Sequence, residues 1–533
     1  MEQTKKIKAE NLNQKKGKAT KVKSTGSVLK KTKLRKPELL SPAGNLEKLK
    51  IAIAYGADAV YGGVSQFSLR AQSGKEFTYD SFREGVEYAH QHGVKVYATV
   101  NSFPFENQLP LVETHLRKLA EIGVDGLIVS SLGVLTKARE IAPEIDLHLS
   151  TQANALNSWD YKIYHQLGIK RIIVARESSL TDLIKIRKQV PEVEIEIFIH
   201  GAVCFAYSGR CLISAVQFGR NPNKGSCAND CRYPYYLYIE NRETGTLLKM
   251  EEYPDGTYIL NSKDLCLLYH LPKLIKSGVI DSFKIEGRTK SPYYVGVVTG
   301  AYRRAIDEII ETGECNCNLY FSQIATTKNR GFTDGFIVKR PFQRLDTQNL
   351  NRPIGEGTGQ VAGEVTEMGD RFLAKHTIRP GDRFEIILPA RERIKWIEER
   401  EGKRENKLDR KKKWANSGKR EEQGKGNMEN LLSKKSFKLK EKKASKGKVI
   451  EKSPEKKLSK VSEKNGIGQN PNTQVLIQNR IGTIYRQEEK FYLQLNQIEL
   501  ADGRQLPIIH SGNRNPILLP ASLPPFSFLL VKF

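Results

Sequence analysis

Short apolar runs alternate with segments of helical period over most of the first two thirds of the chain. A short apolar run between turn residues predicts a buried strand, and apolar residues spaced three and four apart predict an amphipathic helix. Eight candidate strands follow: Glu38–Ser41, Ala57–Gly62, Val94–Val100, Asp125–Ser130, Asp146–Ser150, Arg171–Ala175, Glu194–His200 and Ser282–Glu286. Helical stretches such as Asn45–Tyr55, Ser81–His92 and Leu109–Ile122 separate them. This alternation is typical of a parallel sheet with crossover helices.

Eight strand–helix units over about 270 residues match the size of a (β/α)8 TIM-like barrel. A doubly wound open sheet is the alternative, but eight strands of similar apolar character favour closure. Gly56, Gly93, Gly123 and Gly168 follow four of the helices, where a residue with positive φ can end the last turn. We therefore predict an α/β barrel domain over residues 37–330.

One connection in this pattern is abnormal. About 80 residues separate the seventh strand from the eighth, and four of the seven cysteines lie there. Loops at the carboxyl ends of the strands build the active site of this fold. A Cys-rich insertion over residues 202–281, before the last strand, is therefore a functional signal.

After a long helical stretch near Pro292–Glu311, the pattern changes to short strands with turn residues. The candidates are Gly359–Thr366, Phe372–His376, Asp382–Leu388, Val475–Leu476, Gly482–Tyr485 and Phe491–Leu495. They predict a small C-terminal all-β barrel formed from residues 331–397 and 471–533. A charged stretch, residues 398–470, interrupts it.

The net charge of +27 first suggests a nucleic-acid binder. Residues 1–36 carry a net charge of +11 and residues 398–470 carry +12, which leaves +4 on the other 424 residues. Both stretches have little apolar surface to bury, so we predict a disordered basic arm and a disordered Lys/Glu-rich insertion. The charge is compatible with a polyanionic partner, but it does not identify the function.

Several protein classes are excluded by the same composition. No run of about 18 apolar residues predicts a spanning helix, and the N-terminus lacks the apolar region of a secretory signal. Seven cysteines, an odd number, do not form the pattern of a secreted disulfide framework. We expect a cytoplasmic protein without membrane contact, in which clustered cysteines bind metal or take part in chemistry.

Four cysteines are spaced C-x6-C-x15-C-x3-C, and they are Cys204, Cys211, Cys227 and Cys231. Thiolates are the natural ligands of iron–sulfur clusters and of structural zinc. The spacing differs from the C-x2-C of most zinc ribbons, which disfavours zinc; unrelated buried cysteines are the remaining alternative. Cys266 lies in an apolar run and is predicted to be core, and Cys315 and Cys317 lie in a polar turn with no predicted role.

Polar residues also follow the strand ends, where side chains of such a barrel usually line its mouth. The predicted catalytic residues are Arg176, His200, Glu286 and Arg288. The predicted substrate-binding residues are His148, Gln152, Asn154 and Glu177. Arg176 and Arg288 can each bind a carboxylate or phosphate through two parallel hydrogen bonds. Glu286 acts either as a general base or to orient Arg288. A structural ion-pair network is the alternative for each residue.

The segment EIFIHGAVCFAYSGRCLIS, residues 196–214, resembles the signature of the collagenase-like peptidase family, number thirty-two of the unassigned-type peptidases. That signature fixes a Glu, a Phe, two Gly, two Cys and a Ser at set spacings. Further segments resemble the same family: ELLSPAG (38–44), HLSTQAN (148–154), ARE (175–177), GSCANDCR (225–232), SKDL (262–265), KIEGR (284–288), NRGF (329–332) and GDRFEI (381–386). The resemblance covers about residues 37–395 and 474–533; the basic arm and the charged insertion lie outside it.

The resemblance implies a function partly at odds with the family's name. Members were named as proteases, some of them collagen-degrading, but other relatives support oxygen-independent hydroxylation of a tRNA wobble uridine, of a ribosomal RNA cytosine or of ubiquinone precursors. The ubiquinone branch binds a 4Fe-4S cluster through four cysteines, which match the four spaced cysteines here. The C-terminal barrel resembles the tRNA branch, whose members form 5-hydroxyuridine and depend on prephenate.

The resemblance therefore implies a tRNA uridine hydroxylase-type enzyme with an iron–sulfur cluster and prephenate as co-substrate. Arg176 and Arg288 would hold the carboxylates of that dicarboxylate. Its partners would be tRNA, the dicarboxylate, and an electron donor or a paralogous protein. A collagenase-like peptidase and a non-catalytic RNA-binding or assembly factor with a structural metal such as zinc are the alternatives.

Overall fold

The computed structural model describes residues 34–64, 67–69, 76–233, 235, 237–250, 261–338, 347, 349, 357–400 and 472–532. Eight parallel strands form its main sheet: β1 (Glu38–Pro42), β2 (Ala59–Gly62), β3 (Lys95–Val100), β4 (Gly126–Val129), β5 (Asp146–Leu149), β6 (Ile169–Ile173), β7 (Glu194–Ala202) and β11 (Ser282–Ile285). Seven neighbouring pairs run in the order β11-β1-β2-β3-β4-β5-β6-β7, and parallel pairing of β11 with β7 closes the ring. The predicted TIM-like barrel is confirmed, and the open sheet is wrong.

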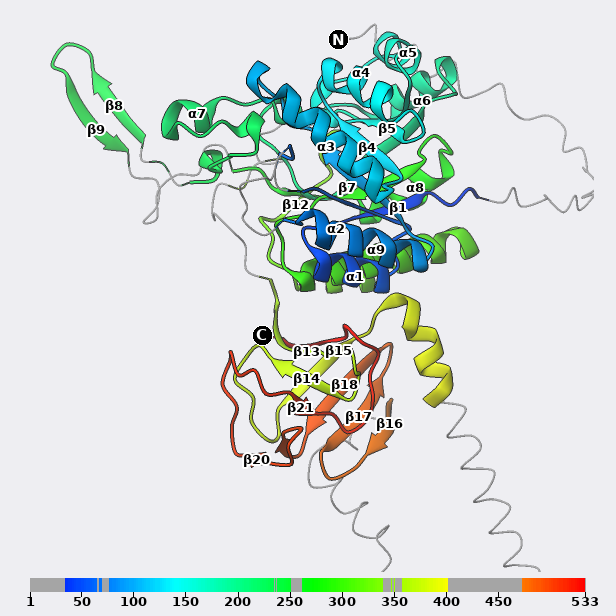
Figure 1. Cartoon of the computed structure of the whole chain (residues 1–533). Helices are drawn as coiled ribbons and strands as arrows, with labels where there is room; N and C mark the ends of the chain where they lie inside the picture. Colours follow the sequence, from blue (N-terminus) through cyan, green and yellow to red (C-terminus); the bar gives the residue numbers. More distant parts are fainter. Residues whose placement is uncertain are drawn as a thin grey trace, which may run out of the picture. The chain divides into compact units, whose positions relative to one another are not determined.

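Helices cover the outside of the barrel between its strands (Figure 1). They are α1 (Leu46–Ala54), α2 (Tyr79–Gln91), α3 (Leu109–Ile122), α4 (Leu132–Ile141), α5 (Ser158–Gln166), α6 (Leu180–Gln189), α8 (Leu271–Lys276) and α9 (Pro292–Thr312). Side chains satisfy the first amide groups of several helices; Asn45, for example, accepts a hydrogen bond from the amide of Lys48. The four glycines predicted to end helices have φ values of +96°, +67°, +82° and +90° in chain order, as that role requires.

The barrel interior holds a network of buried and partly buried charges, which we call the interior ion network (Glu38, Arg171, Glu194, Glu196 and Lys284). The guanidinium of Arg171 lies 2.6 Å from Glu38, 2.7 Å from Glu194 and 3.3 Å from Glu196. Lys284 Nζ lies 2.8 Å from Glu196 Oε1. Each charge therefore has an opposite partner, which offsets the cost of removing it from water.

The insertion between β7 and β11 contains one barrel helix and the segment that carries the four spaced cysteines, residues 203–233, which we call the cysteine loop. Its elements are α7 (Ile213–Phe218), the hairpin β8 (Leu237–Asn241) and β9 (Thr246–Met250), β10 (Asp264–Cys266) and α8. Strand β10 pairs antiparallel with β7 and parallel with β12 (Phe332–Thr333), so it extends the barrel sheet beyond the ring. Cys266 is buried in β10, which confirms the prediction that it is core.

The C-terminal strands form an antiparallel sheet. They are β13 (Gly359–Val365), β14 (Arg371–Ala374), β15 (Arg383–Ile387), β16 (Thr473–Gln478), β17 (Gly482–Gln487), β18 (Lys490–Leu495), β21 (Ile517–Leu518) and β22 (Phe528–Lys532), and a separate small hairpin joins β19 (Ile498–Glu499) to β20 (Gln505–Leu506). Strand β15 pairs with β18 and β22, so segments on both sides of the charged insertion share one sheet. The predicted all-β domain is confirmed as this eight-stranded sheet.

Two edges of the predicted disordered segments are ordered in the structure. Residues 390–400 are helical, and Trp396 of this stretch is buried edge-on against Phe491, with ring centroids 5.4 Å apart. Disorder beginning at residue 398 is therefore wrong, because this apolar anchor holds the helix. At the other end, Arg35 and Lys36 pair with Asp281 and Asp307. Residues 1–33 and 401–471 lie outside the described part of the chain.

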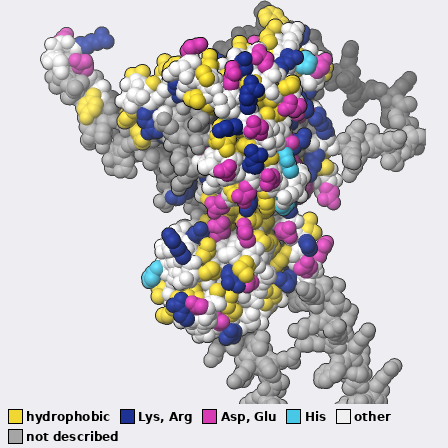
Figure 2. Space-filling view, in the orientation of Figure 1, with side chains coloured by type: hydrophobic (Ala, Val, Ile, Leu, Met, Phe, Trp, Pro, Cys, Tyr) yellow, Lys and Arg dark blue, Asp and Glu magenta, His cyan; other side chains and the backbone are white. Residues whose placement is uncertain are grey.

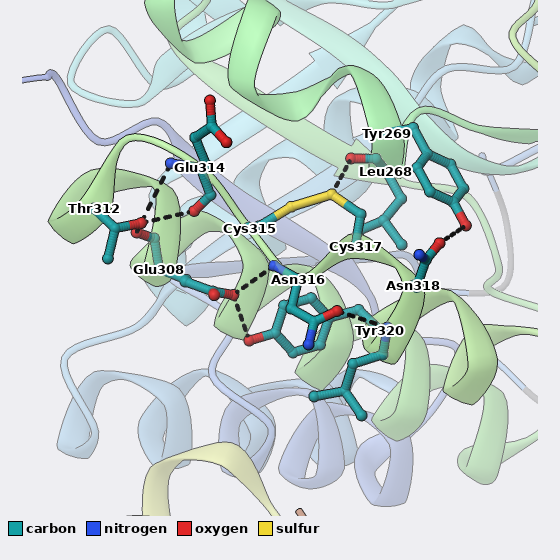
Figure 3. The surroundings of a disulfide bond; sticks show 11 residues. Leu268, Tyr269, Glu308, Thr312, Glu314, Cys315, Asn316, Cys317, Asn318 and Tyr320 are labelled. Atoms are coloured by element: carbon teal, nitrogen blue, oxygen red, sulfur yellow. Dashed lines mark hydrogen bonds between the residues drawn. A yellow bond between two sulfur atoms is a disulfide. The ribbon is translucent and has the colours of Figure 1, made fainter.

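The turn between α9 and α10 (Cys317–Ile324) contains a disulfide between Cys315 and Cys317, whose Cα atoms are 5.3 Å apart (Figure 3). Glu308 accepts hydrogen bonds from the amide of Asn316 at 3.1 Å and from the hydroxyl of Tyr320 at 2.9 Å, which holds this turn against α9. The sequence assigned these two cysteines no role. The other five cysteines are free thiols.

On the face shown in Figure 2, basic and acidic side chains are interspersed over the described surface. This agrees with the small net charge that remains once the two basic stretches are set aside. Within the described ranges, no helix has the length and apolar character needed to cross a membrane.

Candidate active site

A cavity of about 150 Å³ opens at the carboxyl ends of the barrel strands. Its floor is apolar and aromatic, from Tyr61, Ile128, Ile173 and Phe198. Polar and charged side chains from strand ends stand around this floor: Thr99, Gln152, Arg176, Lys284, Glu286 and Arg288. The cysteine loop forms the remaining wall. We call this space the cysteine cavity.

All four spaced cysteines line the cysteine cavity, and all four are free thiols: Cys204, Cys211, Cys227 and Cys231. Burial raises the pKa of the Cys231 thiol, and the other three thiols add to that rise because they lie close enough to repel its thiolate. In the described part of the chain, no three His, Cys, Asp or Glu side chains are grouped so as to hold one metal ion. The structure thus gathers four thiols around one cavity without forming a compact mononuclear site.

Glu177 holds the first half of the cysteine loop. It accepts hydrogen bonds from the amide of Ser208 at 2.8 Å and from its hydroxyl at 2.5 Å. The amide of Arg176 donates to the same hydroxyl at 3.2 Å. Ser208 is fully buried with φ +42°, an unusual conformation that these bonds maintain. Glu177, predicted to bind substrate, therefore contacts the loop between Cys204 and Cys211 in this structure.

Two further residues of the signature segment explain how the loop begins and ends. Gly201 has φ +108°, and a Cβ there would lie 2.3 Å from the carbonyl oxygen of Glu286, so only glycine lets β7 turn so close to β11. Ser214 of α7 accepts a hydrogen bond from the amide of Ala228 at 2.6 Å. That bond ties α7 to the segment carrying the second pair of cysteines.

The two predicted arginines differ in their surroundings. Arg176 stacks on the ring of Phe198 at 4.7 Å and, among the described residues, pairs with no carboxylate. Arg288 is buried; its guanidinium donates to Ser68 Oγ at 2.7 Å and to Thr99 Oγ1 at 2.9 Å, and it lies 3.4 Å from Glu76. Arg176 is therefore available to a ligand, whereas Arg288 is largely occupied.

Glu286 and Lys284 stand on the same strand end. Glu286 accepts a hydrogen bond of 3.4 Å from the hydroxyl of Tyr61. Burial lowers the pKa of Lys284, and its pairing with Glu196 opposes that effect. Lys284 Nζ also lies 4.2 Å from the centre of the Tyr61 ring. It thus joins the interior ion network to the cavity floor.

Besides Glu177, three predicted residues lie outside the cavity lining. His200 is buried among Tyr294, Tyr302 and Phe332, and burial, aided by Lys290, lowers its pKa to about 3. A neutral imidazole packed between rings does not reach a ligand in the cavity. The other two are His148 and Asn154.

His148 packs edge-on against Tyr97, and burial lowers its pKa well below the usual range. Asn154 adopts φ +59°, and its side-chain amide atoms are buried without a hydrogen-bond partner among the described residues. Gln152 does line the cavity, and its side-chain oxygen accepts from Ser130 Oγ at 3.4 Å. A position near a strand end therefore did not by itself decide which way a side chain points.

Sequence reasoning also missed residues of the site. Tyr61 lies near the end of the second strand and Thr99 near the end of the third, so the strand-end rule applied to all eight strands would have found both. Ser68 and Glu76, which hold Arg288, lie in the loop after β2, and no pattern in that loop signals them.

Comparison with known proteins identifies the family. Residues 44–347 match the family model described as Peptidase family U32. The tRNA hydroxylation protein P of Helicobacter pylori strain J99 is 44% identical over 493 residues, covering 92% of this chain and 98% of the relative. The protein of the same name from Escherichia coli K12 is 37% identical, covering 66% and 86%. A collagenase of Porphyromonas gingivalis is 32% identical, covering 67% and 90%. The chain belongs to peptidase family U32.

Proposed function

We propose that this protein is a tRNA-modifying enzyme that hydroxylates uridine at the wobble position, forming 5-hydroxyuridine without molecular oxygen. The observation that carries the proposal is the cysteine cavity, where four free thiols and an arginine without a carboxylate partner surround one apolar floor. The relatives named tRNA hydroxylation protein P support the choice of tRNA as substrate.

We propose that the four cysteines hold a 4Fe-4S cluster rather than a single zinc ion. Tetrahedral zinc, with bonds of about 2.3 Å, would hold its sulfurs roughly 3.8 Å apart. Among the described residues no three His, Cys, Asp or Glu side chains are grouped to hold one metal ion, whereas four thiols line one cavity. In a cluster each thiolate binds a different iron, so the sulfurs stand farther apart. When bound, the cluster would supply one-electron transfer at the cavity wall.

The protein's own residues would bind and orient a small dicarboxylate co-substrate, for which we propose prephenate. Arg176 would donate two parallel hydrogen bonds to one carboxylate, while the ring of Phe198 keeps the guanidinium plane in place. Tyr61, Ile128 and Ile173 would exclude water beneath the reacting groups. Glu286, bonded to the Tyr61 hydroxyl, is placed to hold a proton at the cavity edge.

The proposed reaction is tested by nucleoside mass spectrometry of tRNA from a strain that lacks this protein and its paralogues. We expect 5-hydroxyuridine and the nucleosides derived from it to disappear and to return when the gene is restored. Unchanged amounts in the deletion strain would refute the proposal.

The cofactor is tested separately by visible absorption and EPR of the anaerobically purified full chain. We expect a broad band near about 400 nm and about four irons per chain. A colourless protein that contains zinc would remove the redox role and favour the non-catalytic RNA-binding or assembly factor.

A peptidase is the second candidate, and the similarity to a named collagenase favours it. A cysteine or serine peptidase needs a nucleophile with a base within hydrogen-bond reach. In the described wall of the cysteine cavity there is no histidine, and His200 and His148 are packed elsewhere. Cleavage of gelatin by purified protein, lost in Cys211→Ser, would revive this candidate.

A further inference from the structure

A second cavity, of about 290 Å³, lies beside the cysteine cavity and shares Cys227 and Glu286 with it. Three basic side chains line it: Arg220, Arg232 and Lys290. We propose that this basic cavity binds a backbone phosphate of the RNA strand whose base enters the cysteine cavity. The inference rests on the proposed function and adds the site that would position its substrate.

The charges around the basic cavity are not balanced within the described lining. Glu286 is the one carboxylate of that lining; Arg220 and Lys290 are the weakly compensated cations, whereas Arg232 has a partner of its own. Arg220 donates to Ser226 Oγ at 3.4 Å and to the carbonyl of Cys227 at 3.5 Å, both long, and pairs with no described carboxylate. A phosphate would supply the missing negative charge and strong acceptor oxygens.

Lys290 is poorly compensated for a different reason. Its Nζ lies 4.0 Å from Asp264, but Arg330 lies 2.6 Å from the same carboxylate and takes most of its charge. Burial lowers the pKa of Lys290; Asp264 opposes the change, whereas Arg330 and Arg232 add to it. An anion bound in the cavity would stabilise the charged ammonium group and oppose the lowering of its pKa.

Neighbouring surface favours RNA over a free small anion. Aromatic side chains of the cysteine loop stand 45–54% exposed close to the two cavities in sequence: Phe205, Tyr207, Phe218 and Tyr233. Residues 203–233 contain four basic side chains and one acidic side chain. Unstacked RNA bases bind to aromatic faces while basic residues hold the phosphates.

The test measures binding of the full chain to a synthetic tRNA anticodon stem-loop at several salt concentrations. The variant carries Arg220→Gln and Lys290→Gln, and a control with equal loss of charge carries Lys162→Gln and Lys188→Gln on the exposed faces of α5 and α6. Each lost single-strand phosphate contact lowers the slope of log affinity against log salt by about 0.7, so losing the one proposed contact should lower the slope by about 0.7 in the variant. The control should keep the wild-type slope. A variant with Arg220→Lys in place of Arg220→Gln should recover part of the lost slope.

Other outcomes separate this inference from the proposed function. Wild-type protein that neither binds the stem-loop nor hydroxylates tRNA would refute the function itself. Wild-type hydroxylation together with a wild-type slope in the double variant would refute the phosphate site alone. The site is also refuted if the double variant only loses iron, or only needs more dicarboxylate for half-maximal activity. A thermal melt confirms that each variant is folded.

Discussion

The interior ion network and the mouth of the barrel use the same residue types in opposite ways. In the network, Arg171 lies between three carboxylates and Lys284 pairs with Glu196 at 2.8 Å. At the mouth, Arg176 and Arg220 face cavities and pair with no described carboxylate. Lys284 joins the two regions, because it pairs with Glu196 and also lines the cysteine cavity.

This contrast distinguishes charges that hold the fold from charges that await a ligand. A charge taken out of water without a partner is costly, so an unpaired arginine in a cavity marks a place where a bound group would offset that cost. A paired arginine inside the barrel already donates its hydrogen bonds to neighbouring carboxylates and is not available to bind a ligand. Substitutions in the two regions should therefore affect different measurements.

The largest effect on stability is expected from Arg171→Met. The variant leaves three carboxylates without their shared partner, and breaking a buried ion pair costs about 3–5 kcal/mol in the free energy of unfolding. The matched control is its neighbour, Lys170→Met, which loses an exposed pair with Asp146 and should cost less than about 1 kcal/mol. Urea unfolding at neutral pH measures both, and equal losses would remove the distinction.

At the mouth, Arg176→Met should alter ligand binding and leave stability nearly unchanged. Losing a charged hydrogen-bond partner costs about 1.5–3 kcal/mol, so the dicarboxylate concentration for half-maximal hydroxylation should rise roughly 10- to 100-fold. Arg210→Met is the control, because that guanidinium already donates to the carbonyl of Gln152 at 2.9 Å. A large drop in unfolding free energy with unchanged co-substrate dependence would make Arg176 a structural residue.

Ser208→Ala should loosen the cysteine loop by a smaller amount. It removes the hydroxyl that joins Glu177 to the amide of Arg176, at a cost of about 1–2 kcal/mol. Because cleavage follows the population of the open form, trypsin should cut after the exposed Arg210 about tenfold faster. Ser322→Ala in α10 provides the control, and equal cleavage rates in both variants would show that this contact does not hold the loop.

The smallest predicted effect concerns His200 and pH. Its folded pKa of about 3 lies below the ordinary value near 6.5, so the unfolded chain binds a proton first as pH falls. The stability gained from a neutral His200 is present above about pH 6.5 and is lost toward pH 3. Between pH 7 and 5.5 the wild type should lose about 1 kcal/mol more than His200→Asn. Parallel pH profiles of unfolding free energy would contradict this assignment.

The barrel itself was predictable because its strands are buried on both faces. Each apolar run marks one strand, and a positive-φ glycine ends several of the helices, so local pattern and fold agree. The split β domain was predictable for the same reason, since its strands alternate on either side of the insertion. The helix over residues 390–400 was missed because one buried residue, Trp396, outweighs its charged composition.

The sequence predicted the site only for residues whose type and whose position in the chain both indicated it. Four cysteines in one loop converge on one cavity, as their spacing suggested, and Arg176 points there too. His148 and His200 both lie near strand ends, but His148 packs against Tyr97. His200 follows a register shift between β7 and β11 and packs against Tyr294 and Tyr302 of α9. The basic cavity depends on residues from two distant segments, 220–232 and 286–290, which sequence spacing alone does not bring together.

The most direct test of the account compares two cysteines in the same nucleoside assay. A strain without the gene is complemented with wild type, with Cys227→Ser from the cysteine cavity, or with Cys266→Ala from the buried strand β10. We predict that 5-hydroxyuridine-derived nucleosides return with wild type and with Cys266→Ala but not with Cys227→Ser at equal protein level. Full restoration by Cys227→Ser would contradict the claim that the cysteine cavity carries the chemistry.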